Sequence, residues 1–204
     1  MASKAEQAEA TRRALLKAAR RLFTRRGYGA TSVDAVVVAA KVTKGALYHH
    51  FVDKAALFQA VFEEIEDETV QRLIERAGEG TDPLSALHNG AEAFLDICLD
   101  PAVRRIALIE GPTVLGWERW RELELAHGMG IGRLVLQAAM DAGQIPPQPL
   151  EPIVHLLFGA LIEGALLVAN SKDPAASKRE VSGLISAMID GLTGTHSDPS
   201  GLDD

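Results

Sequence analysis

Residues 31–54, TSVDAVVVAAKVTKGALYHHFVDK, decide how the N-terminal part of this chain folds. The stretch holds two short segments, each preceded by a hydroxyl side chain that can cap a helix: residues 33–40 after Thr31 or Ser32, and residues 44–50 after Thr43. The valine-rich first segment could also form a strand, but the cap before it and the helical segments beside it favour a helix. Two short helices joined by a turn at Lys41-Val42 predict a helix-turn-helix.

The second short segment carries side chains that suit contact with DNA. In a helix-turn-helix the second helix enters the major groove, where its first residues meet base edges. Lys44 can donate to base edges or phosphates, and Gly45 lets the backbone approach closely. Tyr48 and His49 supply polar tips that can reach either. Because pairs of short helices also occur in ordinary helical bundles, this pattern alone does not settle DNA binding.

The charge of the chain is distributed unevenly. Residues 1–55 hold eleven Lys and Arg against four Asp and Glu, a net of +7, whereas the whole chain has 21 bases and 28 acids, a net of −7. The remainder therefore carries −14. An acidic protein with a basic N-terminal quarter is expected to meet a polyanion through that quarter alone. A solvated basic helix face is the alternative interpretation.

The rest of the chain reads as helical. Apolar residues recur at helical spacing almost throughout, and no segment alternates with a period of two, so we predict an all-α fold of about nine helices. Asp82-Pro83, Asp100-Pro101 and Asp173-Pro174 each place a capping acceptor before a proline at the first helical position. We expect the final ten residues, 195–204, to be disordered.

The composition argues against several classes of protein. The chain has 204 residues and one cysteine, Cys98, which cannot form an intramolecular disulfide or a thiolate zinc cluster. The N-terminus lacks an apolar secretory segment, so we expect a cytoplasmic protein. His49 and His50 point in different directions on a helix and do not form a metal site, and Gly111–Gly116 lacks the Lys-Ser/Thr of a phosphate loop. We expect no enzyme activity, no cofactor and no metal.

Three groups of residues resemble the N-terminal signature of the TetR-type transcriptional repressors: residues 27–33 (GYGATSV), residues 42–51 (VTKGALYHHF), and Asp53-Lys54 before Leu57. The resemblance is close over residues 12–62. It implies a helix-turn-helix DNA-binding domain, which we place at residues 1–52, and a ligand-binding and dimerisation domain at residues 53–194. By this resemblance Ser32, Tyr48 and Lys54 match positions that hold phosphates, and Thr43, Lys44, Gly45 and His49 match positions that face the groove.

Two residues depart from the family pattern. Lys41 stands where the family usually has glycine in the turn, so this residue must accept a left-handed conformation or the turn must differ. Asp34 stands where many relatives carry a residue that reaches DNA, and its carboxylate would be repelled by phosphate. We therefore leave Asp34 out of the expected contacts.

The C-terminal helices predict a dimer. Residues 153–170 are apolar nearly all round, and a helix with no polar face needs more cover than its own chain provides. Leu184, Ile185, Met188 and Ile189 supply a second apolar stripe. We expect a homodimer that presents two reading helices to a near-palindromic double-stranded DNA operator, with no membrane partner.

The expected effector is a small apolar, aromatic or polycyclic molecule that releases the repressor from its operator. If the resemblance holds, its pocket lies among the helices that begin near Asp53, Asp82, Asp100 and Trp117. The expected lining is Phe94, Cys98, Ile106, Trp117, Trp120, Leu123 and His127, with His127 or Glu163 orienting the ligand. The alternative for this pocket is that the two tryptophans are ordinary core residues. The alternative for the whole protein is a helical interaction module whose basic face binds an acidic partner or membrane surface.

Overall fold

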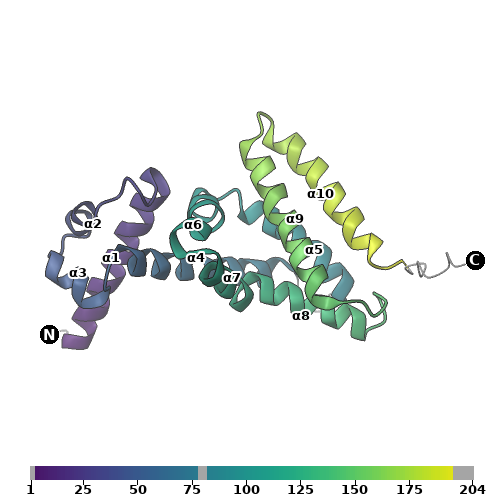
Figure 1. Ribbon diagram of the computed structural model, residues 1–204, viewed down its shortest axis with the longest axis horizontal. Coiled ribbons are helices and arrows are strands. Elements are labelled where there is room, and N and C mark those ends of the chain that lie inside the picture. The colour runs from purple at the N-terminus through teal and green to yellow at the C-terminus, as the bar shows by residue number, and fades with distance from the viewer. Residues whose placement is uncertain (1–2, 78–81, 195–204) are drawn as a thin grey trace, which may run out of the picture. The chain divides into compact units, whose positions relative to one another are not determined.

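The computed structural model describes residues 3–77 and 82–194. Within these ranges every regular element is helical, which confirms the all-α prediction (Figure 1). The elements are α1 (Lys4–Arg26), α2 (Val33–Ala40), α3 (Lys44–His50), α4 (Lys54–Ala77), α5 (Pro83–Ile97), the π-helix η1 (Val103–Glu110), α6 (Gly111–Leu115), α7 (Trp117–Ala126), α8 (Gly128–Asp141), α9 (Leu150–Asn170) and α10 (Pro174–Gly191). The expected disordered tail, residues 195–204, lies outside the described residues.

The described residues form more helical segments than the nine expected, because two of the predicted helices are divided. The helix predicted after Asp100 begins as the π-helix η1 and continues as the short α6. The helix predicted from Trp117 ends at Ala126, where His127 has φ −119° and ψ −113°, and α8 starts at Gly128. Both breaks lie beside glycines, which lower the cost of leaving regular α-helical geometry.

The capping residues predicted from the sequence perform that role. Ser32 Oγ accepts from the backbone N–H of Ala35, and Thr43 Oγ1 accepts from that of Ala46. Asp53 Oδ1 accepts from the backbone N–H of Ala56 at the start of α4. The three Asp-Pro pairs also begin helical segments, each with the aspartate accepting from a backbone N–H of the first turn. Local side-chain chemistry therefore sets where these helices begin.

The chain divides into two compact units, and α4, the longest helix that the structure describes, contributes to both. The first unit contains residues 1–71 and 97–128, and the second contains residues 72–96 and 129–204. The first unit therefore includes α1, α2, α3, most of α4, η1, α6 and α7. The second holds most of α5, almost all of α8, and α9 and α10.

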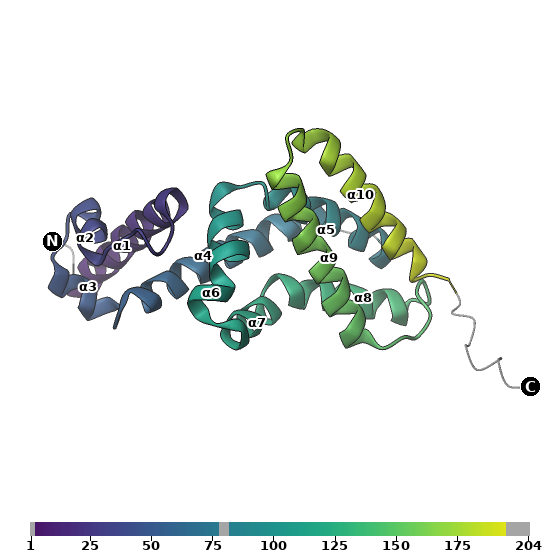
Figure 2. The same ribbon diagram turned by 45° about the horizontal axis from the view of Figure 1, so that its top comes forward.

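A small head of three helices forms the N-terminal part of the first unit. Helices α1, α2 and α3 contact one another and lie side by side in both ribbon views (Figures 1 and 2). The contact is apolar, and its fully or almost fully buried residues are Leu15, Leu16, Ala19, Phe23, Val36, Val37, Leu47 and Phe51. Phe23 also packs on Phe58 of α4, with ring centroids 5.4 Å apart. This shared core fixes α2 and α3 on the start of α4.

The turn between α2 and α3 contains a left-handed residue, although the sequence has Lys41 there instead of glycine. Lys41 adopts φ 58° and ψ 41°, a left-handed conformation, and it is the only non-glycine residue with positive φ among those the structure describes. Its N–H bonds to the carbonyls of Val37 and Val38 and so closes α2. The turn thus keeps the shape that glycine would adopt freely, at a cost of about 1–2 kcal/mol for a residue with a side chain.

In the second unit, α9 and α10 form an antiparallel pair (Figures 1 and 2). Gly164 allows the close approach, since a methyl group built there would lie 2.7 Å from Cγ1 of Val181. The other side of the pair stays exposed: Leu156 is 72% exposed and Leu184 is 68% exposed. Helix α9 is long and apolar enough to cross a membrane, yet only a third of its apolar window is buried in the structure. The described residues therefore leave a large apolar face of this pair exposed.

Candidate functional site

Most of the residues that the sequence assigned to DNA are exposed on the head. They are Ser32, the N-cap Thr43, and Lys44, Gly45, Tyr48 and His49 of α3, and Tyr48 retains 48% of its accessible surface. Leu47, which is fully buried, anchors α3 on the core from the opposite side. Helix α3 therefore presents a polar, hydrogen-bonding face at its N-terminal half, as a helix that enters a groove requires.

Gly45 has no packing reason to be glycine. A methyl group built there would meet only Oγ1 of Thr43, at 3.9 Å, among the described atoms. Its φ also lies outside the left-handed region. What glycine provides here is a bare backbone on an exposed helix face, and this fits the expectation that another molecule approaches it closely.

Asp34 of α2 forms an ion pair with Lys44 of α3. Its Oδ1 lies 3.0 Å from Nζ of Lys44, and this contact raises the pKa of the Lys44 ammonium. Both side chains are more than half exposed, so the pair is weak in water. In the DNA-free protein, one expected base or phosphate donor is therefore held by a carboxylate from α2.

Lys54 is used inside the protein. Its ammonium donates to the carbonyl oxygens of Tyr28 at 2.9 Å and Thr31 at 3.1 Å, and it lies 3.9 Å from the centroid of the Tyr28 ring. The sequence predicted a phosphate contact for this residue, which stays a prediction. The geometry gives Lys54 a further role: it ties the start of α4 to the loop between α1 and α2.

A second tie to this loop comes from residues that the sequence did not indicate. Glu110, the last residue of η1, accepts a hydrogen bond from the N–H of Tyr28 at 2.9 Å. Arg105 of η1 donates to the carbonyl of Thr24 at 3.2 Å, near the end of α1. Gly27 allows this approach, because a side chain there would collide with the Glu110 carboxylate. Tyr28 is thus held through its N–H by η1 and through its carbonyl by α4.

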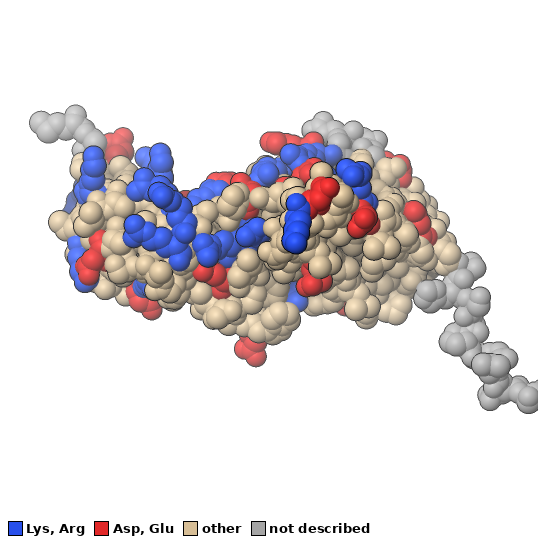
Figure 3. Space-filling view, turned by 90° about the horizontal axis from the view of Figure 1, so that it is seen from above, with Lys and Arg blue, Asp and Glu red and all other residues tan. Residues whose placement is uncertain are grey.

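Basic side chains lie on the surface of the head. Figure 3 shows Lys and Arg side chains, with fewer acidic ones, on the face of α1, α2 and α3 at the left of that view. These include Arg25 and Arg26 in the last turn of α1, both of which are exposed. The charge asymmetry seen in the sequence is therefore a surface property, and it favours a polyanionic partner.

The residues expected to line an effector pocket fall into both units. Cys98, Ile106, Trp120, Leu123 and His127 are buried or half-buried in the first unit. In the second unit, Phe94 is buried with its ring centroid 5.8 Å from that of Phe158. Their role in ligand binding stays a prediction.

Two members of that set are not placed as expected. Trp117 is 61% exposed rather than inward-facing, because it is the first residue of α7 and no earlier turn of that helix covers it. Its ring lies against the Trp120 ring, with centroids 5.0 Å apart. Glu163 is exposed on α9, so it does not face the interior of its own unit.

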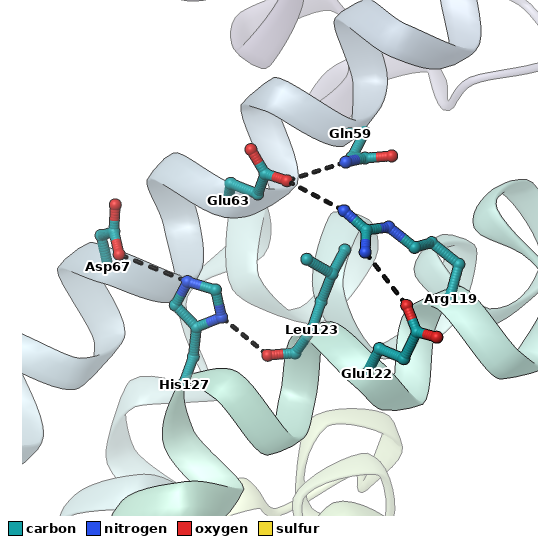
Figure 4. A network of polar contacts seen from close by, with 7 residues as sticks. All are labelled: Gln59, Glu63, Asp67, Arg119, Glu122, Leu123 and His127. Atoms are coloured by element: carbon teal, nitrogen blue, oxygen red, sulfur yellow. Dashed lines mark hydrogen bonds and ion pairs between the residues drawn. The ribbon is translucent and has the colours of Figure 1, made fainter.

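His127 is held by protein groups on both ring nitrogens (Figure 4). Nδ1 donates to the carbonyl of Leu123 at 2.6 Å, and Nε2 lies 3.4 Å from Oδ1 of Asp67. A parallel link joins Arg119 of α7 to Glu63 of α4 at 3.8 Å. These two links place α7 against α4.

Buried polar side chains lie next to this network, and we did not predict their burial from the sequence. Glu66 and Thr69 of α4 and Glu124 of α7 are 4%, 3% and 2% exposed. The signal was available: Glu66 and Thr69 follow Phe62 and Ile65 at helical spacing, and Glu124 follows Trp120 by four residues. They therefore occupy core positions on apolar stripes, where a carboxyl group needs an explanation.

A serine, a histidine and an aspartate also meet in the second unit. Ser186 Oγ lies 3.2 Å from Nδ1 of His88, and Nε2 of His88 lies 3.1 Å from Asp190. Ser186 and His88 border a groove of about 150 Å³ between α5 and α10. Because Ser186 lies inside α10, the N–H groups around it serve the helix and cannot stabilise an oxyanion. This arrangement does not support hydrolysis.

An exposed polar reading helix on a compact basic head defines a helix-turn-helix DNA-binding protein. Residues 15–61 match the family model described as "Bacterial regulatory proteins, tetR family". Residues 84–192 match the model described as "Tetracyclin repressor-like, C-terminal domain". The chain belongs to the TetR family and is a helix-turn-helix transcriptional regulator.

Relatives with known names agree with this assignment. The chain is 28% identical to the Transposon Tn10 TetC protein of Escherichia coli, over 85% of this chain and 87% of that protein. It is also 28% identical to the HTH-type transcriptional regulator UidR of Escherichia coli K12, over 91% and 94%. The crystal structure of a TetR-family regulator from Pectobacterium atrosepticum is similar, with a TM-score of 0.75, 30% identity, and coverage of 94% and 97%. These relatives are regulators rather than enzymes.

Proposed function

We propose that this protein is a cytoplasmic repressor that binds a near-palindromic operator as a homodimer and leaves it when a small molecule with an apolar body binds the C-terminal domain. The observation that supports operator binding most strongly is the exposed polar face of α3 above its buried anchor, Leu47. Groups on such a face can meet bases without disturbing the fold. The proposal divides the contacts into those that position the protein and those that read sequence.

In this proposal Ser32 and Tyr48 bind phosphates, while Thr43, Lys44, Gly45 and His49 face the groove. The test is fluorescence anisotropy of a labelled operator with the variants Tyr48→Phe and His49→Ala. Each lost contact is expected to weaken operator binding by roughly 1–3 kcal/mol, that is, about fivefold to 150-fold. Tyr48→Phe should weaken binding to all sequences equally, whereas His49→Ala should change the preference among sequences.

The matched control is Lys17→Ala, which removes an exposed basic residue from α1 without touching α3. If Tyr48→Phe and His49→Ala bind operator as tightly as Lys17→Ala, α3 is not the reading helix.

Asp34 is proposed to weaken DNA binding through its pair with Lys44. DNA must break the 3.0 Å contact before the ammonium can serve a base or phosphate. The Asp34→Asn variant should therefore bind operator more tightly than the parent, and the difference should shrink in Lys44→Ala. An unchanged affinity in Asp34→Asn would show that the pair does not compete with DNA.

The exposed apolar face of α9 and α10 is the proposed dimer interface. Leu156, Leu167, Leu184 and Met188 are 72%, 56%, 68% and 46% exposed, and together they resemble the centre of a subunit contact. The helix pair would meet its copy across a two-fold axis and form a four-helix contact. Leu184→Glu should give a monomer in light scattering, whereas Lys172→Glu, an exposed change in the connection between α9 and α10, should leave the dimer intact.

Effector binding is proposed to act on the head through α4 and η1. Lys54 at the start of α4 binds the carbonyl oxygen of Tyr28, and Glu110 at the end of η1 binds the N–H of the same residue. A shift of either helix therefore reaches the head. Ligand and operator must then weaken each other by the same factor. Glu110→Gln keeps the acceptor oxygen but removes the charge, and it should reduce this mutual effect. Equal coupling in the variant and the parent would exclude this route.

A further inference from the structure

Three buried polar side-chain atoms on α4 and α7 have no hydrogen-bond partner among the described residues, although the Trp120 indole acts on the Glu124 carboxyl group and lowers its pKa. The atoms are Oγ1 of Thr69, Nε1 of Trp120 and Oε1 of Glu124, and each of these residues is 2–3% exposed. Glu66, 4% exposed, lies one helical turn before Thr69. Proteins rarely bury such groups without a partner, since each orphaned group costs about 1–3 kcal/mol and more when charged.

These groups gather where α4 and α7 meet. The links from Asp67 to His127 and from Glu63 to Arg119 hold the two helices together (Figure 4). In the sequence of α4, Glu66 lies between Glu63 and Asp67. Trp120 and Glu124 are one turn apart on α7. Oε2 of Glu66 would lie 4.0 Å from a methyl group built on Gly128, two residues after the end of α7, and the charge of Glu66 helps to raise the pKa of Glu124.

The surroundings of the two carboxyl groups supply little positive charge. Burial raises the pKa of Glu66 to about 7. His127 opposes this rise, and the charge of Asp67 adds to it. Arg121 lowers the pKa of Glu124 without overcoming burial. His127 is already engaged by Leu123 and Asp67, and the Arg121 guanidinium lies over the rings of Trp117 and Trp120 at 4.6 and 4.8 Å. Two buried carboxyl groups thus share a site in which one further cation would be strongly favoured.

We infer that Glu66, Thr69 and Glu124 bind the protonated amino group of an effector whose remainder is apolar. The inference rests on the proposed function, in which a small molecule binds this domain. A primary ammonium has three N–H donors and no acceptor, which matches two carboxylates and a hydroxyl. Trp120 adds an aromatic wall that attracts cations. Trp120 also packs closely, since a methyl group on Gly111 would lie 3.0 Å from both its ring and the ring of Phe62.

The test uses four probes that share one apolar body: 1-naphthylmethylamine, 1-naphthylmethanol, 1-ethylnaphthalene and 1-naphthylacetate. Isothermal titration calorimetry of the full chain should show the ammonium binding at least about tenfold more tightly than the other three, with the carboxylate weakest. Glu124→Gln should remove most of this preference, while Glu118→Gln, on the exposed side of the same helix, should keep it. Equal binding of ammonium and alcohol, or a preference that survives Glu124→Gln, would overturn the inference.

Proton release gives a second readout. Because a bound cation favours ionised carboxylates, ammonium binding near neutral pH should release protons, seen as different heats in phosphate and Tris buffers. His127→Gln is measured beside the parent as the control for the imidazole that contacts Asp67 next to this site. Release that persists in His127→Gln and disappears in Glu66→Gln supports the carboxyl site. Release that disappears only in His127→Gln contradicts it.

Operator release is measured separately with the same probes. If the alcohol or the hydrocarbon binds and frees the operator while the ammonium does neither, the proposed function stands and the inference fails. If the ammonium binds through Glu124 but leaves the operator bound, the inference stands and the proposed release fails.

Discussion

Replacement of Lys54 by methionine should destabilise the head, although Lys54 looks like a surface lysine in the sequence. The variant keeps most of the aliphatic length but loses two hydrogen bonds to carbonyl oxygens, at 2.9 and 3.1 Å, and a cation over the Tyr28 ring at 3.9 Å. A hydrogen bond from a charged group contributes about 1.5–3 kcal/mol and a cation–π contact about 0.5–2 kcal/mol. The lower ends sum to about 3.5 kcal/mol, and because Lys54 is partly exposed we reduce this sum and expect a loss of about 2–3 kcal/mol.

Urea unfolding followed by circular dichroism measures this loss. With a slope of about 2 kcal/mol per molar urea, the midpoint should fall by about 1–1.5 M. Lys17→Met, an exposed change on α1, should stay within about 0.5 kcal/mol of the parent. Operator affinity is then compared at a temperature where both variants are folded. If Lys54→Met has parental stability but loses operator affinity, Lys54 acts only on phosphate, and the internal role argued from the structure is wrong.

Three further changes follow from local geometry. Lys41→Gly should stabilise the protein by about 1 kcal/mol, because glycine adopts φ 58° without strain, and a lowered melting temperature would contradict the left-handed turn. Gly164→Ala should destabilise the second unit by about 1–3 kcal/mol, because the new methyl group would meet Val181 at 2.7 Å; unchanged thermal stability would show that α9 and α10 can separate freely. The unfolding free energy should fall as the pH rises from about 4.5 to about 7, because burial raises the pKa of Glu66 from 4.5 to about 7 and the folded protein then binds more protons than the unfolded chain. Glu66→Gln should flatten this dependence in denaturant titrations, and an unchanged slope would place the responsible groups elsewhere.

The sequence predicted the parts of this fold that depend on local chemistry. The caps Ser32, Thr43 and Asp53 begin their helices as expected, because a side-chain acceptor and a free N–H lie only three residues apart. The left-handed turn at Lys41 is one of the two alternatives that the family resemblance left open. The exposed face of α3 followed from the same short-range pattern.

Contacts between distant segments could not be read in this way. Lys54 and Tyr28 are 26 residues apart, and Glu110 and Tyr28 are 82 apart, so no spacing rule connects them. The start of the helix near Trp117 was predicted, but the inward position assigned to Trp117 was wrong because residue spacing does not show how much of a first turn the rest of the chain covers. The burial of Glu66 and Glu124 was not predicted, although their spacing from apolar residues placed them in the core.

Selection of binding sites from random duplex DNA tests the central claim most directly. The parent protein and Tyr48→Phe are each incubated with the DNA pool, and the enriched sequences are then titrated with parent protein between about 50 and 200 mM salt. The account predicts a near-palindromic site bound at least about a thousandfold more tightly than random sequence, with affinity that falls as salt rises. Enrichment of no sequence, or binding that depends on salt alone, would contradict sequence-specific reading by α3.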